Sequence, residues 1–207
     1  MRRVLSARYD RRLERHVIGF LKVGGRRSMN AINKLEASWV PRVQELNSEQ
    51  NATRVSEFYL SEMSFDDQRH TPGELEHFRR APLASLKERN HRHWYIENEE
   101  GRIIAVTSCK ENEHRTDGYL WDYLVVHRDY RRLGLASLLF QSLEAFVRKM
   151  DGRYILTYTC DLPEYKPVQK LFVMNGFVHI GTYPDYYYEG EARLAFHKKL
   201  SSGLQIV

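Results

Sequence analysis

"VVHRDYRRLGLASLLF", residues 125–140, is the stretch that decides the fold of this 207-residue chain. It starts with an apolar run that ends at Val126, continues through a charged segment, and takes on helical spacing from Leu135. This pattern predicts a buried strand that leads through a tight loop, here called the elbow (residues 127–137), into a helix. Such a loop presents unpaired backbone N–H groups at the positive end of the helix dipole, where phosphate binds. With Gly134 as the single glycine, spacing alone leaves a phosphate site and a plain turn both open.

Composition limits the class of protein. The chain is 42% hydrophobic, and its two cysteines, Cys109 and Cys160, match neither a metal-binding spacing nor a disulfide framework. No apolar run approaches the roughly 18 residues that a membrane-spanning helix needs. We therefore expect a cytoplasmic protein with one domain and an attachment, and no contact with a membrane.

The net charge of +5 is unevenly distributed. Residues 1–27 contain eight Arg and one Lys against two acidic residues, whereas the rest of the chain has 23 basic and 25 acidic residues. A basic segment of this kind can bind nucleic acid, but it is more often a solvated helix face. Apolar residues recur every fourth position from Leu5 to Leu21, which predicts an amphipathic helix whose apolar stripe needs burial. We therefore expect it to pack on the rest of the chain or on a second subunit, and we do not expect nucleic acid as a partner.

A second helix is predicted from Ser28, with apolar residues spaced as far as Val43 and with Pro41 bending or shortening it. The composition then changes near residue 50. We divide the chain into a basic N-terminal extension of two helices (1–50), an α/β domain (51–203) and a short C-terminal tail (204–207).

Strand and helix patterns alternate within the α/β domain. The expected helices cover 71–90, 135–150 and 163–175. The expected strands cover 53–63, two segments around a turn at 99–101, 118–127, 153–160, 177–183 and 193–200. This order predicts a mixed α/β architecture with a right-handed β-α-β crossover between the strand at 118–127 and the strand at 153–160.

The elbow also carries a motif. "RRLGLA", with Arg131, Gly134 and Ala136 in the defining positions, resembles the acyl-CoA signature Gln/Arg-x-x-Gly-x-Gly/Ala of the GNAT superfamily of N-acetyltransferases. Residues 168–200 resemble the C-terminal half of the same superfamily, with an apolar helix, Asn-Gly-Phe, a strand, a Tyr-rich loop and a basic final strand. The resemblance covers residues 53–200. It implies the GNAT fold, a mixed, mostly antiparallel twisted sheet of six to seven strands with flanking helices, here with an N-terminal helical extension.

The resemblance implies that acetyl-CoA is the co-substrate and that its pyrophosphate binds the elbow amides. The residues concerned are Arg131, Arg132, Leu133, Gly134, Leu135, Ala136 and Ser137. The pantetheine arm would lie in a splayed gap beside the strand at 118–127 and pair with the backbone of Leu124, Val125 and Val126. The N–H near Val126 would then donate to the thioester oxygen and stabilise the oxyanion of the reaction.

Acetyl transfer to an amine needs a group that removes a proton from that amine. Asp122 is the candidate general base, because it occupies the position where related proteins often carry Glu. We expect its side chain on the same strand face as Leu124 and Val126. The alternatives are a water chain, an Asp122 that only orients the substrate or makes a structural hydrogen bond, and, as weaker candidates, Glu62 and Glu97.

The leaving thiolate is commonly protonated in this family by a Tyr at the position of Phe172, which has no proton to give. Tyr158 and Tyr165 are the candidates to replace it, and unassisted departure of the thiolate is the alternative. Phe172 also permits the hypothesis that the chain binds acyl-CoA with little activity.

A Tyr-rich stretch at 183–191 lies between the last two predicted strands. In the peptide N-terminal branch of the family a Tyr pair in this loop lines the acceptor groove, which implies Tyr183, Tyr186 and Tyr187 as substrate-binding residues. Tyrosine offers a broad apolar contact and one hydrogen bond at low entropic cost. Neighbouring acidic residues favour a cationic acceptor. A hairpin with stacked surface aromatics is the alternative.

The leading hypothesis is an acetyl-CoA-dependent N-acetyltransferase that acetylates a primary amine, either a protein N-terminus or lysine or a small amine such as a polyamine. The alternative is a non-catalytic acyl-CoA sensor or interaction module. A homodimer could form through the N-terminal helices or the sheet edge. The nine histidines are scattered without a metal-binding spacing, so we assign no metal.

Overall fold

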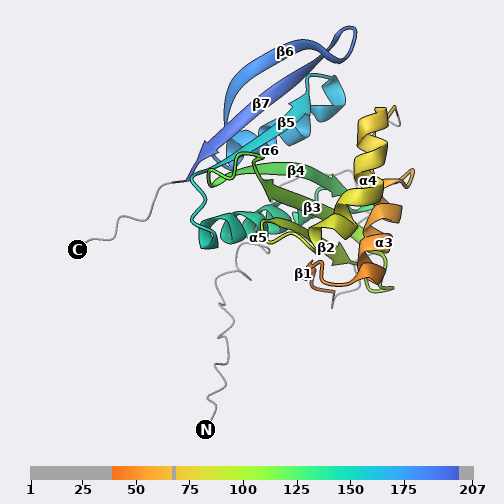
Figure 1. Ribbon diagram of the computed structural model, residues 1–207. Coiled ribbons are helices and arrows are strands. Elements are labelled where there is room, and N and C mark those ends of the chain that lie inside the picture. Colours follow the sequence, from red (N-terminus) through yellow and green to blue (C-terminus); the bar gives the residue numbers. More distant parts are fainter. Residues whose placement is uncertain (1–38, 67–68, 201–207) are drawn as a thin grey trace, which may run out of the picture.

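The computed structural model describes residues 39–66 and 69–200. Within them, one seven-stranded sheet in the order β1-β2-β3-β4-β5-β7-β6 organises the fold, with β1 and β6 at opposite ends (Figure 1). Its strands are β1 (Val43–Glu45), β2 (His91–Glu97), β3 (Ile103–Glu111), β4 (Gly118–Val126), β5 (Tyr154–Cys160), β6 (Val178–Tyr188) and β7 (Glu191–Lys199). Every neighbouring pair is antiparallel except β4 and β5, which are parallel. The predicted mixed, mostly antiparallel sheet is confirmed.

Helices cover both faces of the sheet. They are α3 (Glu49–Tyr59), α4 (Pro72–Ser85), α5 (Leu135–Lys149) and α6 (Lys166–Met174). Side chains of α5 and α6 enter one apolar cluster, whereas those of α3 and α4 enter a second cluster on the other side. Because α5 connects the parallel strands β4 and β5, the predicted β-α-β unit is confirmed.

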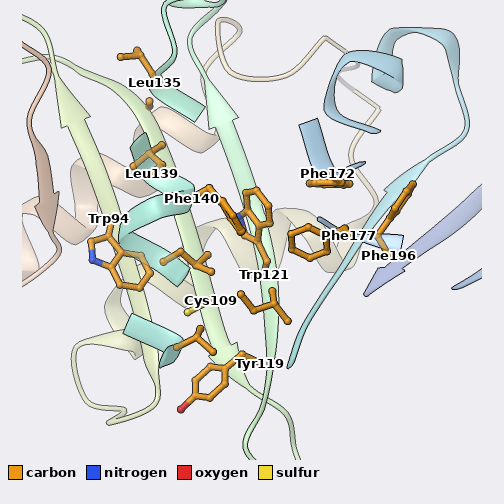
Figure 2. Close-up of a cluster of buried hydrophobic side chains, with 14 of the residues drawn as sticks. Trp94, Cys109, Tyr119, Trp121, Leu135, Leu139, Phe140, Phe172, Phe177 and Phe196 are labelled. Carbon is orange, nitrogen blue, oxygen red and sulfur yellow. The ribbon is translucent and has the colours of Figure 1, made fainter. Parts of the chain in front are cut away.

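An aromatic core fixes β4 against α5 and α6. The Trp121 ring stacks on Phe140 with 4.7 Å between centroids and meets the edge of Phe172 at 5.2 Å (Figure 2). The indole nitrogen of Trp121 donates to the Thr107 hydroxyl at 2.7 Å, so burying this polar atom leaves no unpaired donor. The apolar stripe of α5, which was predicted from its spacing, supplies Leu135, Leu139, Leu143 and Val147 to this cluster.

The predicted strand at 53–63 is wrong, because most of this segment lies in α3. Its aromatic and β-branched residues suggested a strand, but its buried residues are Ala52, Val55, Phe58 and Tyr59, which is the three- and four-residue spacing of a helix. The Ser48 hydroxyl accepts from the N–H of Asn51 and caps the start of α3.

The second predicted helix does not reach Val43. Residues Val43–Glu45 form β1, which pairs antiparallel with β2. The sheet therefore begins before residue 51, where the predicted domain starts. The rest of the predicted N-terminal extension, residues 1–38, lies outside the described residues, as does the tail at 204–207.

The predicted loop at 184–191 is also wrong for most of its length. Strand β6 continues to Tyr188, and the turn is confined to Glu189 and Gly190. Residues 184–187 lie opposite the single residue Ala192, so β6 bulges strongly at its tyrosines. In the described part of the chain, no helix is long and apolar enough to cross a membrane.

Candidate active site

Strands β4 and β5 form a fork. They pair only from Gly118 to Trp121, against Tyr154 to Thr157, although both strands continue beyond these residues. At the point where they part, the Thr157 hydroxyl donates to the carbonyl oxygen of Trp121 at 3.0 Å. From Asp122 onward, β4 therefore has a strand partner on the β3 side only.

The backbone of β4 is directed into this fork at alternate residues. The N–H of His127 donates to the carbonyl of Ile104 at 2.8 Å, so His127 faces β3. Because an antiparallel ladder alternates its hydrogen-bonded residues, the N–H groups of Val126 and Leu124 face the fork instead. The carbonyl of Val126 faces the same way and accepts from Arg131 Nε at 3.1 Å.

The backbone of the elbow leaves a run of N–H groups unpaired. Arg132 and Gly134 both have left-handed backbones, with φ of 64° and 79°. Five consecutive N–H groups, from Arg132 to Ala136, donate to no other described residue. They lead into and include the first residues of α5, where the helix dipole is positive. The Ser137 N–H, by contrast, is used internally, because it donates to the Gly134 carbonyl at 3.0 Å.

The charge of Arg131 is not free for a phosphate. Its guanidinium forms an ion pair with the Asp66 carboxylate, in which Nη1 donates to both carboxylate oxygens at 2.6 and 2.8 Å. The side chain of Arg132 is exposed and has no such partner among the described residues. Of the two arginines, Arg132 is therefore the one whose charge is available to a phosphate. The elbow therefore relies on backbone amides and on one arginine rather than two.

Asp122 is the extra residue of a β-bulge. Tyr123 pairs with Ser108 and Trp121 pairs with Cys109, which leaves Asp122 without a partner on β3. The expectation that Asp122 shares a face with Leu124 does not hold, because the bulge changes the alternation. Leu124 packs against the α5 cluster, whereas Asp122 faces α4 and lies 2.9 Å from His77.

The environment of Asp122 keeps it ionised. Burial alone would raise its pKa, but the hydrogen bond from His77 and the charges of His77, Lys110 and His91 outweigh burial and lower the pKa. The side chain is only 13% exposed, and Lys110 Nζ lies 3.9 Å from the same oxygen. Sequence reasoning missed His77, because nothing in its local pattern distinguishes it from the other scattered histidines.

The weaker alternatives for a base are placed elsewhere. Glu97 is held by Arg54 at 2.6 Å and by Gln44 at 2.8 Å beside β1. Glu62 is exposed in the segment between α3 and α4. Glu97 therefore lies on the β1 side of the sheet, away from β5.

Tyr158 lies on β5 in an arginine–tyrosine cluster. The Arg193 guanidinium stacks 3.4 Å from the centroid of the Tyr158 ring and also donates to the Tyr186 hydroxyl at 2.5 Å. Burial raises the pKa of Tyr158, although Arg193 opposes the increase. Tyr165 precedes α6 and is half-buried.

Phe172 is a core residue. It is 3% exposed and contacts Trp121, Phe177 and Phe196 (Figure 2). A hydroxyl at this position would enter an apolar cluster, so the packing accounts for phenylalanine here.

The tyrosines of β6 differ in their surroundings. Tyr183 and Tyr186 are exposed, whereas Tyr187 is half-buried. Burial raises the pKa of Tyr187 to about 12 against the opposing charge of Arg193, and Glu74 of α4 adds to the increase. Burial is the main cause that raises the pKa of Tyr123, and the charges of Glu74 and Tyr187 raise it further. The β6–β7 hairpin, α4 and β4 therefore meet on the side of the sheet that Asp122 faces.

A metal site is not evident in the part of the chain that the structure describes, where no group of three or more His, Cys, Asp or Glu side chains is suited to one. Cys109 and Cys160 are free and buried.

Comparison with solved structures supports the fold. A GNAT-family acetyltransferase from Desulfovibrio desulfuricans superposes with a TM-score of 0.66 and 15% identity, covering 78% of this chain and 100% of that one. The ribosomal-protein-S18-alanine N-acetyltransferase from Escherichia coli gives 0.62 and 13%, covering 81% and 99%. An aminoglycoside 6'-N-acetyltransferase complexed with coenzyme A gives 0.62 and 12%, covering 78% and 98%.

Sequence comparison identifies the family. No curated protein sequence matches this chain significantly. The model of the acetyltransferase (GNAT) family matches residues 52–177, which is more than half of the chain and includes the fork and the elbow. The protein therefore belongs to the acetyltransferase (GNAT) family.

Proposed function

We propose that the protein transfers the acetyl group of acetyl-CoA to a primary amine that is bound in its cationic form. The observation that carries this proposal is the continuity of the fork with the elbow. The inward N–H groups of Leu124 and Val126 lead directly to the five free N–H groups at the start of α5. A thioester with a pyrophosphate at its far end fits this sequence of donors.

We assign the pyrophosphate to the elbow amides of Arg131 to Ser137, chiefly Arg132 to Ala136. The backbone of Leu124, Val125 and Val126 is the proposed rail for the pantetheine arm, with the Val126 N–H as the donor to the thioester oxygen. Tyr158 and Tyr165 stay the candidates for protonating the thiolate. The raised pKa of Tyr158 keeps its proton on the hydroxyl at neutral pH, as a general acid requires.

The acceptor is proposed to enter on the α4 side of the sheet. Asp122 and Glu74 place carboxylates there, and Tyr187 supplies a half-buried aromatic surface. This combination suits an ammonium group attached to an apolar or extended chain. Two structural neighbours are named for the acetylation of a protein alanine and of an aminoglycoside, which are both amines. A peptide N-terminus or a polyamine is the acceptor class that we favour.

The experiment that tests this function uses the full chain with acetyl-CoA and four amine probes. These are a peptide with N-terminal alanine, a peptide with an internal lysine, spermidine and kanamycin. Release of free thiol and the mass of the amine are measured together. We expect a gain of one acetyl group on at least one probe. Calorimetric binding of CoA without acetylation of any probe would favour the second candidate, a non-catalytic acyl-CoA sensor, for which the buried Phe172 is the motivating observation.

Two further proposals concern assembly and location. Strand β6 is an edge of the sheet and exposes Val178 and Ile180 at 64% and 57%, so we propose it as a contact of a homodimer. Light scattering on the wild type and on Ile180→Lys tests this, because the dimer should dissociate in the variant. We also propose a cytoplasmic location, since free thiols at Cys109 and Cys160 suit a reducing compartment.

A further inference from the structure

His77 and Asp122 form a buried pair beside the fork. Nε2 of His77 lies 2.9 Å from Oδ2 of Asp122, and the two side chains are 22% and 13% exposed. His77 comes from α4 and Asp122 from the bulge of β4, so the pair exists only through the packing of this helix on this strand. Any catalytic role for the pair rests on the acetyl transfer proposed above.

The position of His77 is fixed by α4. A reciprocal capping box between Thr71 and Glu74 starts the helix, and the next helix residue after His77, Phe78, is fully buried. The His77 ring also packs on the Tyr123 ring, with 5.1 Å between centroids. The imidazole is therefore held between the two strand residues Asp122 and Tyr123.

The two ring nitrogens of His77 differ in their surroundings. Nε2 is buried 2.9 Å from the carboxylate oxygen Oδ2, and neither atom has another hydrogen-bond partner among the described residues. We therefore assign the proton of the neutral imidazole to Nε2, toward Asp122. Nδ1 is then the nitrogen with a lone pair that remains for a substrate. A histidine whose second nitrogen is held by a carboxylate is the arrangement in which imidazole acts as a general base.

Asp122 is better suited to orient the His77 imidazole than to act as the general base itself. A carboxylate with a lowered pKa accepts a proton poorly near neutral pH, whereas the His77 imidazole keeps a second nitrogen that does not face Asp122. The groups that face the pair come from every neighbouring element. They are Tyr59 of α3, His91 and His93 of β2, Lys110 of β3 and Tyr123 of β4. Burial lowers the pKa of both His91 and His93, which leaves them neutral near neutral pH.

We propose that His77 is the general base that deprotonates the acceptor ammonium and that Asp122 is the residue that positions it. His77 Nδ1 takes one proton from the ammonium and later releases it to solvent. The freed lone pair forms the C–N bond with the acetyl carbon, and the C–S bond breaks with its electrons on sulfur. The second proton of the nitrogen is lost as the thiolate gains one. The products are the acetylated amine, the thiol of CoA and one proton.

The test is the pH profile of kcat for His77→Gln, Asp122→Asn and the wild type, with whichever of the four amine probes the wild type acetylates. His77→Gln should lower kcat by about 100-fold or more and leave the Kd for CoA unchanged. Its residual activity should rise with pH, because only the amine that is already deprotonated reacts. Asp122→Asn should lower kcat less and move the acidic limb of the profile to lower pH, because the imidazolium loses its carboxylate.

His114→Gln is the matched control, because this histidine is 79% exposed in the connection between β3 and β4. The variant should behave as the wild type. A His77→Gln enzyme with wild-type kcat and pH profile would overturn the assignment while the proposed function stands. A wild type that binds CoA and acetylates no probe would remove the proposed function and the base together.

A second measurement does not depend on the variants folding well. In the full chain labelled with ¹⁵N-histidine, His77 should show the Nε2–H tautomer at neutral pH, and Asp122→Asn should alter that signal. The Nδ1–H tautomer in the wild type would contradict the proposal, since the base nitrogen would then be protonated.

Discussion

Arg131 donates to both carboxylate oxygens of Asp66 and thereby connects the elbow to the segment between α3 and α4. The same guanidinium donates to the carbonyl oxygens of Ser64 and Val126, at 3.2 and 3.1 Å. One side chain therefore links the end of β4, the start of the elbow and the segment that leads into α4. The proposed donor and acceptor sites share this arginine as a structural connection.

Replacing Arg131 by lysine should weaken both substrates together. Lysine keeps the charge but has a single nitrogen, so it cannot contact Asp66 and the carbonyls of Ser64 and Val126 together. We expect the Kd for CoA and the KM for the amine each to rise several-fold. The free energy of unfolding should fall by less than about 1 kcal/mol, because the Arg131 and Asp66 side chains are 34% and 43% exposed. Calorimetry, steady-state kinetics and denaturation measure these quantities. An increase confined to the Kd for CoA would show that the connection does not reach the acceptor side.

Gly134→Ala should impair CoA binding through backbone conformation alone. An added Cβ at Gly134 meets nothing within 4 Å, but the residue has φ of +79°, which costs an L-residue about 1–2 kcal/mol. Gly101→Ala is the control, because Gly101 has φ of +72°, equally open surroundings and a place in the β2–β3 turn. Both variants should lose similar stability in denaturation. Only Gly134→Ala should raise the Kd for CoA, and equal affinities in the two variants would argue against the elbow as the phosphate site.

The features that the sequence predicted well are local. The strand, elbow and helix at 118–150 are consecutive in the chain, and the elbow motif places its glycine and arginine within a few residues of each other. Its backbone conformation is set by the same few residues, so a pattern in the sequence could indicate it.

The features that were missed depend on packing between distant segments. His77 reaches Asp122 only because α4 lies on β4, and the bulge at Asp122 depends on the register with Ser108. The residue types of the segment at 53–63 predict a strand, but the helical spacing of its buried residues decides the structure. The sequence around the tyrosines of β6 predicts a loop, because the bulge opposite Ala192 leaves no alternating pattern.

Tyr158→Phe should lower kcat if the Tyr158 hydroxyl protonates the leaving thiolate. The expected loss is about 100-fold, with an unchanged Kd for CoA, because the ring and its stacking on Arg193 are kept. Tyr154→Phe on the same strand is the control, since its hydroxyl binds Asn112 at the other end of β5. Tyr165→Phe is measured beside it, and a loss there with an active Tyr158→Phe enzyme would assign the proton donor to Tyr165.

Restoring the family's usual tyrosine should not help this enzyme. In Phe172→Tyr, the added hydroxyl enters a cluster formed by Trp121, Phe177 and Phe196. A buried hydroxyl without a partner costs about 1–3 kcal/mol, so the free energy of unfolding should fall by that amount. Turnover per folded molecule should stay at the wild-type value. A higher kcat would mean that position 172 reaches the leaving sulfur after all.

Stability should decrease below about pH 6.5, the ordinary pKa of an unfolded histidine, because of His93. This residue is 1% exposed, and its ring nitrogens are buried without a hydrogen bond in the described part of the chain. Burial, with His91 and His77, lowers its pKa despite the opposing charge of Asp122. Below the unfolded pKa the unfolded chain therefore binds a proton that the folded chain does not. Each such histidine removes about 1.4 kcal/mol per pH unit until the folded pKa is reached.

Urea denaturation at several pH values between about 8 and 5 measures this slope. His93→Gln should flatten it, because the group that takes up the proton on unfolding is gone, while the substitution itself lowers stability at every pH. His114→Gln removes a histidine that is 79% exposed and should leave the slope unchanged. Equal slopes in the wild type and His93→Gln would mean that His93 accepts a proton in the folded protein, and the buried neutral histidines behind Asp122 would then have to carry charge.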